Sequence, residues 1–507
     1  MMNLIENEFE ERKKLSITEN GAVGYKTTDS ALVDFNFKVS SFRNATEDEI
    51  IKEFDKAFHE HKVYAMKLLF FIRDVRGGLG ERRLFRICYR RLAELDIDLF
   101  YLNLTIISEY GRWDDLISLI GISEVTDTRI VNIINSQLIK DLANLDEGKP
   151  ISLLGKWLPS ENASSKTTKK LARKIRKMMK TSPRKYRLML SKLRSYLDVV
   201  EVKMCDNKWD EIDYSKVPSL ANLKYKEAFI RHDEDRRRGY LDSVRTGDSK
   251  MNMSVATPVD VVTRYTSKNW GVSVNDFDDT LELAWKNLKD VNVSNTLVVA
   301  DGSGSMLTTV GGSRTTTALD VANALAIYTS EHNSGVYKDK YITFSNSPQF
   351  VDLSKKHTLK GKLETALEHS EISNTNIEAV FQLILKVALD NEIPSNEMVD
   401  NILIISDMEF DHAQRGWGRN VNVLTKPLFE TIATDYLKAG YQLPKLVFWN
   451  VNSRTGTIPL KENDLGVTLV SGFSQNVLKM VMSNKFDPYE VLVEMITSPR
   501  YDKVKVE

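Results

Sequence analysis

Hydrophobic positions between about residues 45 and 250 recur at the spacing of amphipathic helices. A capping-box pattern from Thr46 to Glu49 opens the first helix, which continues through Phe54 and Phe58. No stretch of this region alternates with the period of two that a half-buried strand shows. Such a series favours an α-solenoid of HEAT-like stacked helices, although the sequence has no clean repeat. Further helices are predicted over residues 63–74, 80–95, 97–109, 112–121, 128–144, 167–179, 184–198, 217–230 and 232–246.

The pattern changes near residue 291, where short apolar runs begin to alternate with helical segments. This alternation predicts a doubly wound α/β domain with a mainly parallel sheet. Two of the predicted strands end in a carboxylate, Asp301 and Asp407, and ligands bind beyond the carboxyl ends of such strands. Both residues are therefore expected on one edge of the sheet. Strands are predicted over residues 296–300, 341–344, 401–405, 446–450 and 467–470, and helices over 318–326, 376–390 and 424–439.

Length and composition add domain boundaries and a location. A chain of 507 residues is too long for one hydrophobic core. The polar, acidic N-terminus, the two cysteines without a CxxC motif and the lack of an 18-residue apolar run predict a cytoplasmic protein without a membrane partner. We expect an N-terminal tail (1–30), a helical domain (31–290), an α/β domain (291–500) and a short C-terminal tail (501–507).

The loop after the first predicted strand carries candidate metal ligands. Asp301, Ser303 and Ser305 follow one another in a Gly-loosened DGSGS turn, just before a long helix. Thr375 precedes a later helix and supplies a third hydroxyl, and Asp407 supplies a second carboxylate. Hard oxygen ligands of this kind suit Mg²⁺ or another divalent cation. The alternative is an ordinary Gly/Ser turn, which the order of these residues along the chain disfavours.

These five residues resemble the metal-ion-dependent adhesion site (MIDAS) of the von Willebrand factor A family. The resemblance implies that the hydroxyls ligate the metal, that the aspartates often act through water, and that an open position accepts a partner's carboxylate. Glu409, Asp411 and His412 form either a second acidic shell or a solvated loop, and the solvated loop is favoured. Nothing in the spacing of Glu409 and His412 marks a general base for metal-dependent hydrolysis. We therefore expect ligand binding and no enzymatic activity.

The strongest charge asymmetry lies between Lys166 and Arg194, where 13 basic residues occur without any Asp or Glu. Apolar residues repeat along one face of both helices predicted there, so the charges lie on the remaining surface. A positive surface of this kind is typical of nucleic-acid binding driven by phosphate contacts. The alternatives are a solvated helix face and a contact with the acidic metal edge. The predicted RNA contacts are Lys169, Lys170, Arg173, Lys174, Arg176 and Lys177.

A second basic cluster surrounds three glycines, Gly77, Gly78 and Gly80. Main-chain amides at the following helix start could bind an anion, with Arg76, Arg82 and Arg86 nearby, although a structural turn between helices is favoured. Arg76, Arg82 and Arg83 are further predicted RNA contacts. A similar turn spans residues 110–115, where Arg112 and Asp114 are expected to pair. Residues 232–238 are expected to form a solvated, self-paired helix turn without a site.

The motifs RDVRGGLGERRLFR, EYGRWDDL, KWLPSENASSKTTKKLAR and VPSLANLKYKEAFIRHDEDRRRGYLDSV extend the resemblance. With the metal motif after them, they are similar to the TROVE plus von Willebrand A arrangement of the Ro ribonucleoprotein autoantigen and its bacterial relatives, and to an uncharacterised TROVE-related family. The resemblance covers about residues 30–500. It implies a ring of HEAT-like repeats that binds single-stranded RNA ends in its hole and small structured RNAs on its basic outer face.

The sequence thus predicts a Ro-like RNA-binding protein with a divalent-metal-binding von Willebrand A domain. Its partners would be RNA and a protein that offers a carboxylate to the metal. The alternative is a protein-interaction scaffold that captures an acidic partner residue at the metal and binds no nucleic acid. A metal-dependent hydrolase is the least favoured interpretation.

Overall fold

The computed structural model describes residues 15–17, 23–268, 272–291, 293–310, 313–370, 376–409, 426–459, 467–481, 485 and 487–506. The chain folds into two compact units, each built from several segments. The first unit contains Met1–Leu68, Gly77–Leu79 and Met253–Pro499, and the second contains Leu69–Arg76, Gly80–Asn252 and Arg500–Glu507. The two units are defined by contacts within the fold and not by continuous stretches of sequence. The domain boundaries at residues 30, 290 and 500 therefore stay a prediction.

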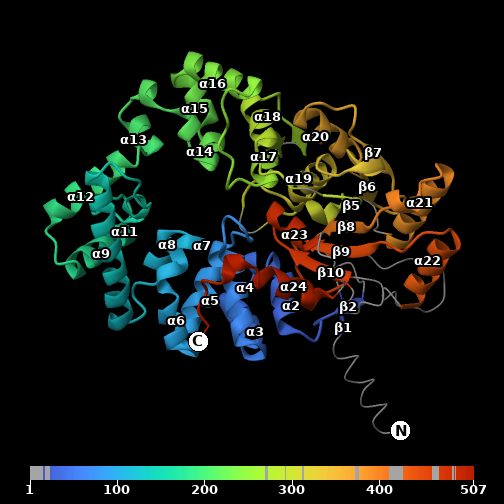
Figure 1. Ribbon diagram of the computed structural model, residues 1–507, viewed down its shortest axis with the longest axis horizontal. Helices are drawn as coiled ribbons and strands as arrows, with labels where there is room; N and C mark the ends of the chain where they lie inside the picture. The colour runs from blue at the N-terminus through green and yellow to red at the C-terminus, as the bar shows by residue number, and fades with distance from the viewer. Residues whose placement is uncertain are drawn as a thin grey trace, which may run out of the picture. The chain divides into compact units, whose positions relative to one another are not determined.

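A six-stranded mixed sheet lies at the centre of the first unit (Figure 1). Its strand order is β10-β9-β8-β5-β6-β7, in which β7 is antiparallel to β6 and all other neighbours are parallel. The five predicted strands are confirmed, whereas the three-residue edge strand β7 was not predicted. The strands are β5 (Thr296–Asp301), β6 (Lys340–Phe344), β7 (Phe350–Asp352), β8 (Asn401–Ser406), β9 (Lys445–Asn450) and β10 (Val467–Ser471).

The central residues of the strands are mostly apolar because helices cover the sheet. Every residue of β5, β8, β9 and β10 is buried, as expected when both faces of a parallel sheet are packed. Figure 1 shows α19 on one side of the strands and α21 with α22 on the other. The chain leaves β5 toward β6 and later returns to β8 on the other side of β5, so the strand order reverses between β5 and β8. The three helices are α19 (Ala318–Glu331), α21 (Ile377–Asp390) and α22 (Lys426–Lys438).

Polar anchors attach the N-terminal helices of the first unit to the sheet. The Asn450 Nδ2 atom donates to the Phe37 carbonyl at 2.9 Å, and the Ser40 hydroxyl donates to the Asn450 carbonyl at 2.9 Å. These bonds place the end of α2 at the carboxyl end of β9. The remaining elements of the unit are β1 (Leu15–Ile17), β2 (Val23–Tyr25), α2 (Ala31–Phe37), α3 (Glu47–Glu60), α17 (Pro258–Tyr265), β3 (Thr266–Ser267), β4 (Ser273–Val274), α18 (Asp279–Lys286), α20 (Leu359–Glu368), α23 (Leu478–Val481) and α24 (Pro488–Ile496). The unit boundary falls within α4 (Lys62–Arg73).

Lys445 at the start of β9 gives the first unit a pH-dependent stability. Its side chain is buried, and burial lowers the pKa of its amine to about 8, against the opposing charge of Glu494. An unfolded lysine titrates near pH 10.4, so between these values the unfolded chain binds more protons and stability rises with pH. We predict that Lys445→Met removes this rise. Urea titrations should show a stability difference between the two proteins that changes from pH 8 to pH 10, and a constant difference would contradict the assignment.

The second unit is entirely helical, as the pattern predicted. Two predicted helices are each divided in the structure, 97–109 into α6 and α7, and 217–230 into α14 and α15. Across the described residues of both units, no helix is long and apolar enough to cross a membrane. The helices are α5 (Arg82–Leu95), α6 (Ile97–Leu102), α7 (Ile107–Tyr110), α8 (Trp113–Ile117), α9 (Glu124–Asp146), α10 (Leu154–Trp157), α11 (Lys166–Met178), α12 (Pro183–Tyr196), α13 (Val200–Cys205), α14 (Ser219–Lys224), α15 (Lys226–His232) and α16 (Glu234–Thr246).

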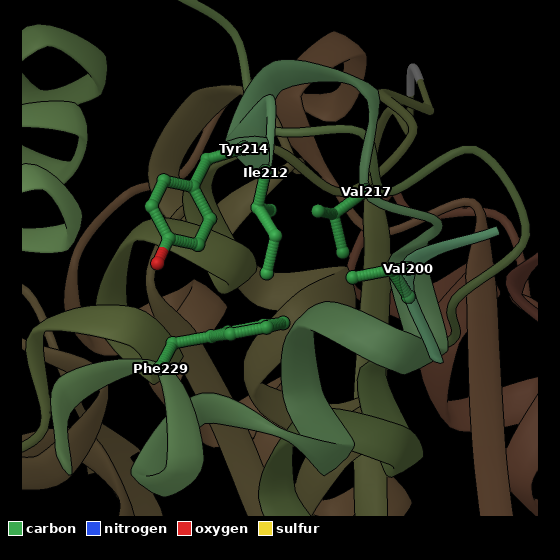
Figure 2. Close-up of a cluster of buried hydrophobic side chains, with 5 residues drawn as sticks. All are labelled: Val200, Ile212, Tyr214, Val217 and Phe229. Carbon is green, nitrogen blue, oxygen red and sulfur yellow. The ribbon is translucent and has the colours of Figure 1, made fainter. Parts of the chain in front are cut away.

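A local core holds α13 to α16 together. Figure 2 shows Tyr214, Ile212, Val217 and Val200 gathered above Phe229. Next to this core, Arg237 is completely buried, donates to the Asn222 Oδ1 atom at 2.9 Å and lies 5.1 Å from the centre of the Tyr214 ring.

The expected solvated turn at residues 232–238 is therefore correct only in part. Arg236 and Arg238 form the local ion pairs that the sequence suggested, with Asp233 at 3.0 Å and Glu234 at 2.8 Å. Arg237, between them, is an anchor of the core instead, because one residue in each helical turn faces inward.

The conspicuous RDVRGG and YGRWDD motifs meet in a buried ion network. The Arg73 Nη2 atom lies 2.6 Å from the Asp115 Oδ2 atom, and both side chains are almost inaccessible to solvent. Arg86 bridges Asp115 and Asp114, each at 2.7 Å. The predicted pair of Arg112 with Asp114 does not form; the Arg112 guanidinium lies 5.2 Å from the Trp157 ring centre instead.

The segment expected as a C-terminal tail packs onto the second unit. Asp74 is buried and accepts hydrogen bonds from the Arg500 guanidinium and, at 3.1 Å, from the Tyr501 hydroxyl. The Lys505 main-chain N–H donates to the Asn103 Oδ1 atom at 2.9 Å, and the Asn103 Nδ2 atom donates to the Lys505 carbonyl at 2.8 Å. No sequence signal marks this segment, because its attachment depends on single polar residues far away along the chain.

Candidate metal centre and candidate nucleic-acid interface

The two aspartates of the DGSGS motif and of β8 lie at the same edge of the sheet. Asp301 ends β5 and Asp407 directly follows β8, and these neighbouring parallel strands are the pair between which the strand order reverses. Crevices at such a reversal are the usual ligand sites of open α/β sheets. Both carboxylates are buried, at 2% and 1% exposure. The predicted ligand Thr375 and the residues Asp411 and His412 lie outside the described residues.

Hydrogen bonds connect the four described ligand candidates. The Ser303 amide donates to Asp301 Oδ1 at 2.9 Å, and the Ser406 hydroxyl donates to Asp301 Oδ2 at 2.6 Å. The hydroxyls of Ser303 and Ser305 lie 3.0 Å apart, and Ser305 hydrogen-bonds Asp407. The structure therefore gathers Asp301, Ser303, Ser305 and Asp407 around one point.

The electrostatics of this edge favour a cation. Burial and the neighbouring charge of Asp301 raise the pKa of Asp407 to about 7, despite opposing contributions from the Glu409 amide, Ser305 and Arg454. A carboxyl group with such a pKa is one whose negative charge is poorly compensated. A divalent ion placed between the two aspartates would remove this penalty.

One distance within the donor set is compatible with Mg²⁺, although it is also that of an ordinary hydrogen bond. Adjacent ligands of an octahedral Mg²⁺ ion, each 2.0–2.1 Å from the metal, lie about 3 Å apart. The two serine hydroxyls have this separation. Among the described residues no three His, Cys, Asp or Glu side chains group closely enough to hold a metal, so a metal here depends on hydroxyl ligands.

The solvated-loop interpretation of Glu409 is wrong. Glu409 is buried, and its Oε1 atom accepts hydrogen bonds from the Arg454 amide at 2.8 Å and the Thr455 amide at 3.0 Å. The hydroxyls of Ser453 and Thr455 donate to the same oxygen at 3.3 and 3.1 Å. Glu409 thus fixes the loop after β9, where the sequence suggested only an acidic residue beyond a strand.

Arg454 was not among the residues predicted for this site. Its Nη2 atom lies 3.5 Å from the Asp407 Oδ2 atom, which makes it a basic neighbour of the aspartate edge. The sequence contained a signal for this residue. Arg454 lies four residues after Asn450, where a predicted strand ends, and in α/β sheets the loops after the strand ends carry the ligand-binding groups.

The basic residues between 166 and 194 lie on α11 and α12, as predicted, except Lys180, which lies between the two helices. Lys170, Arg173 and Lys177 are exposed, and Lys169 is partly exposed. None of these four has an ion pair or side-chain hydrogen bond among the residues that the structure describes.

Two other predicted contacts serve the fold. Lys174 pairs with the buried Asp127 at 2.5 Å, and Arg176 pairs with Glu161 at 2.8 Å and donates to the Thr181 carbonyl. Both side chains hold α11 to its surroundings, so they are weaker candidates for phosphate contact than their neighbours.

The second basic cluster is partly engaged as well. The Arg76 guanidinium donates to the Glu109 carbonyl at 2.9 Å, Arg82 lies 3.8 Å from Asp114, and Arg83 is exposed. The buried residue Glu81 occupies the N-cap position of α5, so a negative charge already stands at this helix start. This arrangement favours the structural turn over an anion site.

Family profiles cover almost the whole chain. The profile described as "Domain of unknown function (DUF2828)" matches residues 18–135 and 124–296, which is more than half of the sequence. The chain belongs to the DUF2828 family. Residues 295–504 match a second profile, "Domain of unknown function (DUF7788)", and neither description names a function.

A viral relative extends the similarity of this DUF2828 protein over nearly its full length. This chain is 31% identical to the relative, "Uncharacterized protein L728" of Acanthamoeba polyphaga mimivirus, over 95% of this chain and 87% of the relative. Among solved structures, the crystal structure of the Deinococcus radiodurans RO (RSR) protein is a remote match, with 14% identity and a TM-score of 0.42 over 93% of this chain and 99% of that chain.

Proposed function

We propose that this protein is a Ro-like RNA-binding protein of the cytoplasm, with a HEAT-like helical part and a von Willebrand A domain that holds a divalent cation. The observation that carries the RNA proposal is a row of cations on α11. Lys166, Lys170, Arg173 and Lys177 are all exposed and follow one another at spacings of four, three and four residues. This spacing places them along one side of the helix, over about 16 Å.

This α11 row (Lys166, Lys170, Arg173 and Lys177) is suited to a phosphate backbone. Its charges have no ion-pair partners among the described residues, so contact with phosphates breaks no internal pair. Arg184, Lys185 and Arg187 add exposed positive charge on α12. Release of counterions from RNA would then drive binding without base-specific contacts. The alternative function, a protein scaffold without nucleic acid, leaves this charge without a role.

Purification in low salt tests the proposal directly. We expect nucleic acid to accompany the protein, seen as a raised ratio of absorbance at 260 and 280 nm that RNase, and not DNase, lowers. Sequencing of the bound RNA would then distinguish small structured RNAs from single-stranded ends. Protein that stays free of RNA at low salt, and that binds no added RNA in filter assays, would favour the scaffold alternative.

For the metal, we propose Mg²⁺ held by Ser303 and Ser305 directly, by Asp301 and Asp407, and by Thr375. When bound, the ion would supply an open, electrophilic coordination position for an anionic ligand. We assign this position to recognition and not to catalysis. Hydrolysis needs a free general base, and Glu409, one of the two candidates, already accepts hydrogen bonds from the loop at residues 453–455.

We predict that Mg²⁺ stabilises the protein against heat and that Asp407→Asn abolishes this effect. Saturation at 100 times the dissociation constant adds about 2.7 kcal/mol. Without metal the variant should be at least as stable as the wild type, because the substitution removes one of two buried like charges. Differential scanning fluorimetry with Mg²⁺ and with EDTA measures both effects.

Asp390→Asn is the matched control for this measurement. It removes an exposed carboxylate from the end of α21, in the same unit. Its response to Mg²⁺ should equal that of the wild type. An equal Mg²⁺ response in the Asp407 variant would show that the ion acts elsewhere.

A further inference from the structure

Arg112 is a half-buried arginine of the second unit whose main chain is held in place from within the fold. It stands just before α8, and its amide donates to the buried Asp115 Oδ2 atom at 2.9 Å. The preceding Gly111 leaves no room for a Cβ atom beside the same carboxylate. The Arg112 guanidinium, in contrast, forms no ion pair and no side-chain hydrogen bond with any residue that the structure describes.

A second half-buried arginine shows what such a side chain normally requires. Arg194 on α12 donates to the Gly155 carbonyl at 3.0 Å and to the Leu158 carbonyl at 2.7 Å. Burial lowers the pKa of Arg194 and of Arg112 alike. Removing a guanidinium from water without acceptors costs free energy, and a bound anion would offset that cost for Arg112.

The charges around Arg112 leave an excess of two positive charges. After burial itself, the guanidinium charges of Arg73 and Arg82 lower its pKa. The two aspartates of the buried ion network oppose this effect, but Arg86 already bridges them. Four guanidinium groups thus stand against two carboxylates. This excess suits a phosphate monoester, which carries close to two negative charges, better than a carboxylate or a phosphodiester with one.

Two side chains beside Arg112 add to its binding capacity. The ring centre of Trp157 on α10 lies 5.2 Å from the guanidinium, and this ring is partly exposed. Aromatic rings and guanidinium planes are surfaces on which nucleobases stack. Arg82 on α5 is 54% exposed and lies 3.8 Å from Asp114, longer than a hydrogen bond. Its guanidinium can therefore turn toward an anion without breaking a tight pair.

We propose that Arg112, Arg82 and Trp157 form a binding site for a nucleotide that carries a phosphate monoester. The two arginines bind the phosphate, and the base stacks on Trp157. The site uses side chains at α5, α8 and α10 and none of the amides at the start of α5. It goes beyond the proposed RNA binding, because it requires neither the α11 row nor a polynucleotide. Free mononucleotides and the 5′-terminal nucleotide of an RNA chain share this chemistry.

Isothermal titration of the full chain with adenosine monophosphate (AMP) tests the site, in EDTA so that no metal contributes. The wild type should bind AMP and should not bind adenosine. Arg112→Gln should weaken AMP binding about tenfold, because it removes the charge-assisted hydrogen bonds to the phosphate. Trp157→Leu should lower the affinity for AMP to that for inorganic phosphate, because the stacking surface is lost.

Control variants separate the site from the fold and from the total charge. Arg231→Gln removes an exposed positive charge on α15 and should leave AMP binding unchanged. Arg82→Gln should weaken AMP binding severalfold, and it carries the test if Arg112→Gln does not fold. Reversing the charges of Lys170, Arg173 and Lys177 should also leave AMP binding unchanged, which separates this site from the α11 row.

The possible results overturn different parts of the proposal. Wild-type protein that binds no AMP, or equal AMP affinity in the wild type and in the variants of Arg112 and Arg82, overturns the site. Adenosine that binds as tightly as AMP overturns the phosphate assignment. Inorganic phosphate that binds as tightly as AMP overturns the role of Trp157 and the assignment of a nucleotide.

Two short RNAs, one with a 5′-phosphate and one with a 5′-hydroxyl, distinguish the sources of the ligand. A preference of about tenfold for the 5′-phosphate that AMP abolishes would identify an RNA end. Equal RNA affinities with AMP binding intact would identify a free mononucleotide. AMP binding in a protein that binds neither RNA would support the nucleotide site and overturn only the proposed RNA binding.

Discussion

Asp115→Ala is expected to lower the free energy of unfolding of the second unit by about 3–5 kcal/mol, because it leaves a buried arginine without its counter-charge. Arg73 and Asp115 are 1% and 0% exposed, and two guanidinium nitrogens lie 2.8 and 2.6 Å from the same carboxylate oxygen. That oxygen also accepts the Arg112 amide at 2.9 Å at the start of α8. Urea denaturation followed by circular dichroism measures the loss.

Asp114→Ala provides the comparison within the same network. Asp114 pairs with Arg86 at 2.7 Å but is 22% exposed, and Arg86 keeps its contact with Asp115 in the variant. We therefore expect a loss below about 1 kcal/mol. Equal losses in the two variants would mean that burial does not decide the energy of this network. The same packing explains Gly111, because a Cβ atom there would lie 2.5 Å from the Asp115 Oδ2 atom.

Reversing three charges of the α11 row, with Lys170→Glu, Arg173→Glu and Lys177→Glu, is expected to weaken RNA binding about 100-fold at moderate salt. Each phosphate contact contributes about −0.7 to −0.9 to the slope of log affinity against log salt, so the slope should flatten by about two. Filter binding of a structured and a single-stranded RNA at four salt concentrations measures both quantities.

A second triple variant separates this local effect from the change in net charge. Lys338, Lys355 and Lys356 are exposed lysines of the first unit, and their reversal to Glu changes the total charge by the same amount. For this control variant, the slope of log RNA affinity against log salt should stay near that of the wild type. Similar losses in the two triple variants would show that α11 has no special part in RNA binding.

The sequence predicted the elements of the sheet because their periodicity is local. All five predicted strands exist, and Asp301 and Asp407 could be placed together since both end parallel strands. The grouping of Ser303 and Ser305 followed from their spacing in one turn. Prediction succeeded where the grouping follows from local periodicity, from spacing within one turn or from the rule that parallel strands end at one edge of the sheet.

Long-range bonds explain what the sequence could not show. Glu409 resembles any acidic loop residue until the loop at 453–455 is folded over it, and Arg454 acquires its position from that bond. Lys174 and Arg176 look identical to their neighbours on α11, and only the positions of Asp127 and Glu161 distinguish them. The antiparallel strand β7 is three residues long, too short for a recognisable alternation.

The docking of the last residues onto the second unit determines how the protein can be divided for experiments. A fragment covering residues 80–252 is a natural choice for studying the helices alone, but it lacks Asp74, Arg500 and Tyr501, which bond one another. Extending the fragment back to residue 69 would restore Asp74 without its arginine and leave Asn103 without the Lys505 main chain. A separately expressed helical unit therefore needs residues 500–506 as well, either joined by a linker or added as a separate peptide. The stability of the unit can then be measured as a function of the concentration of that peptide.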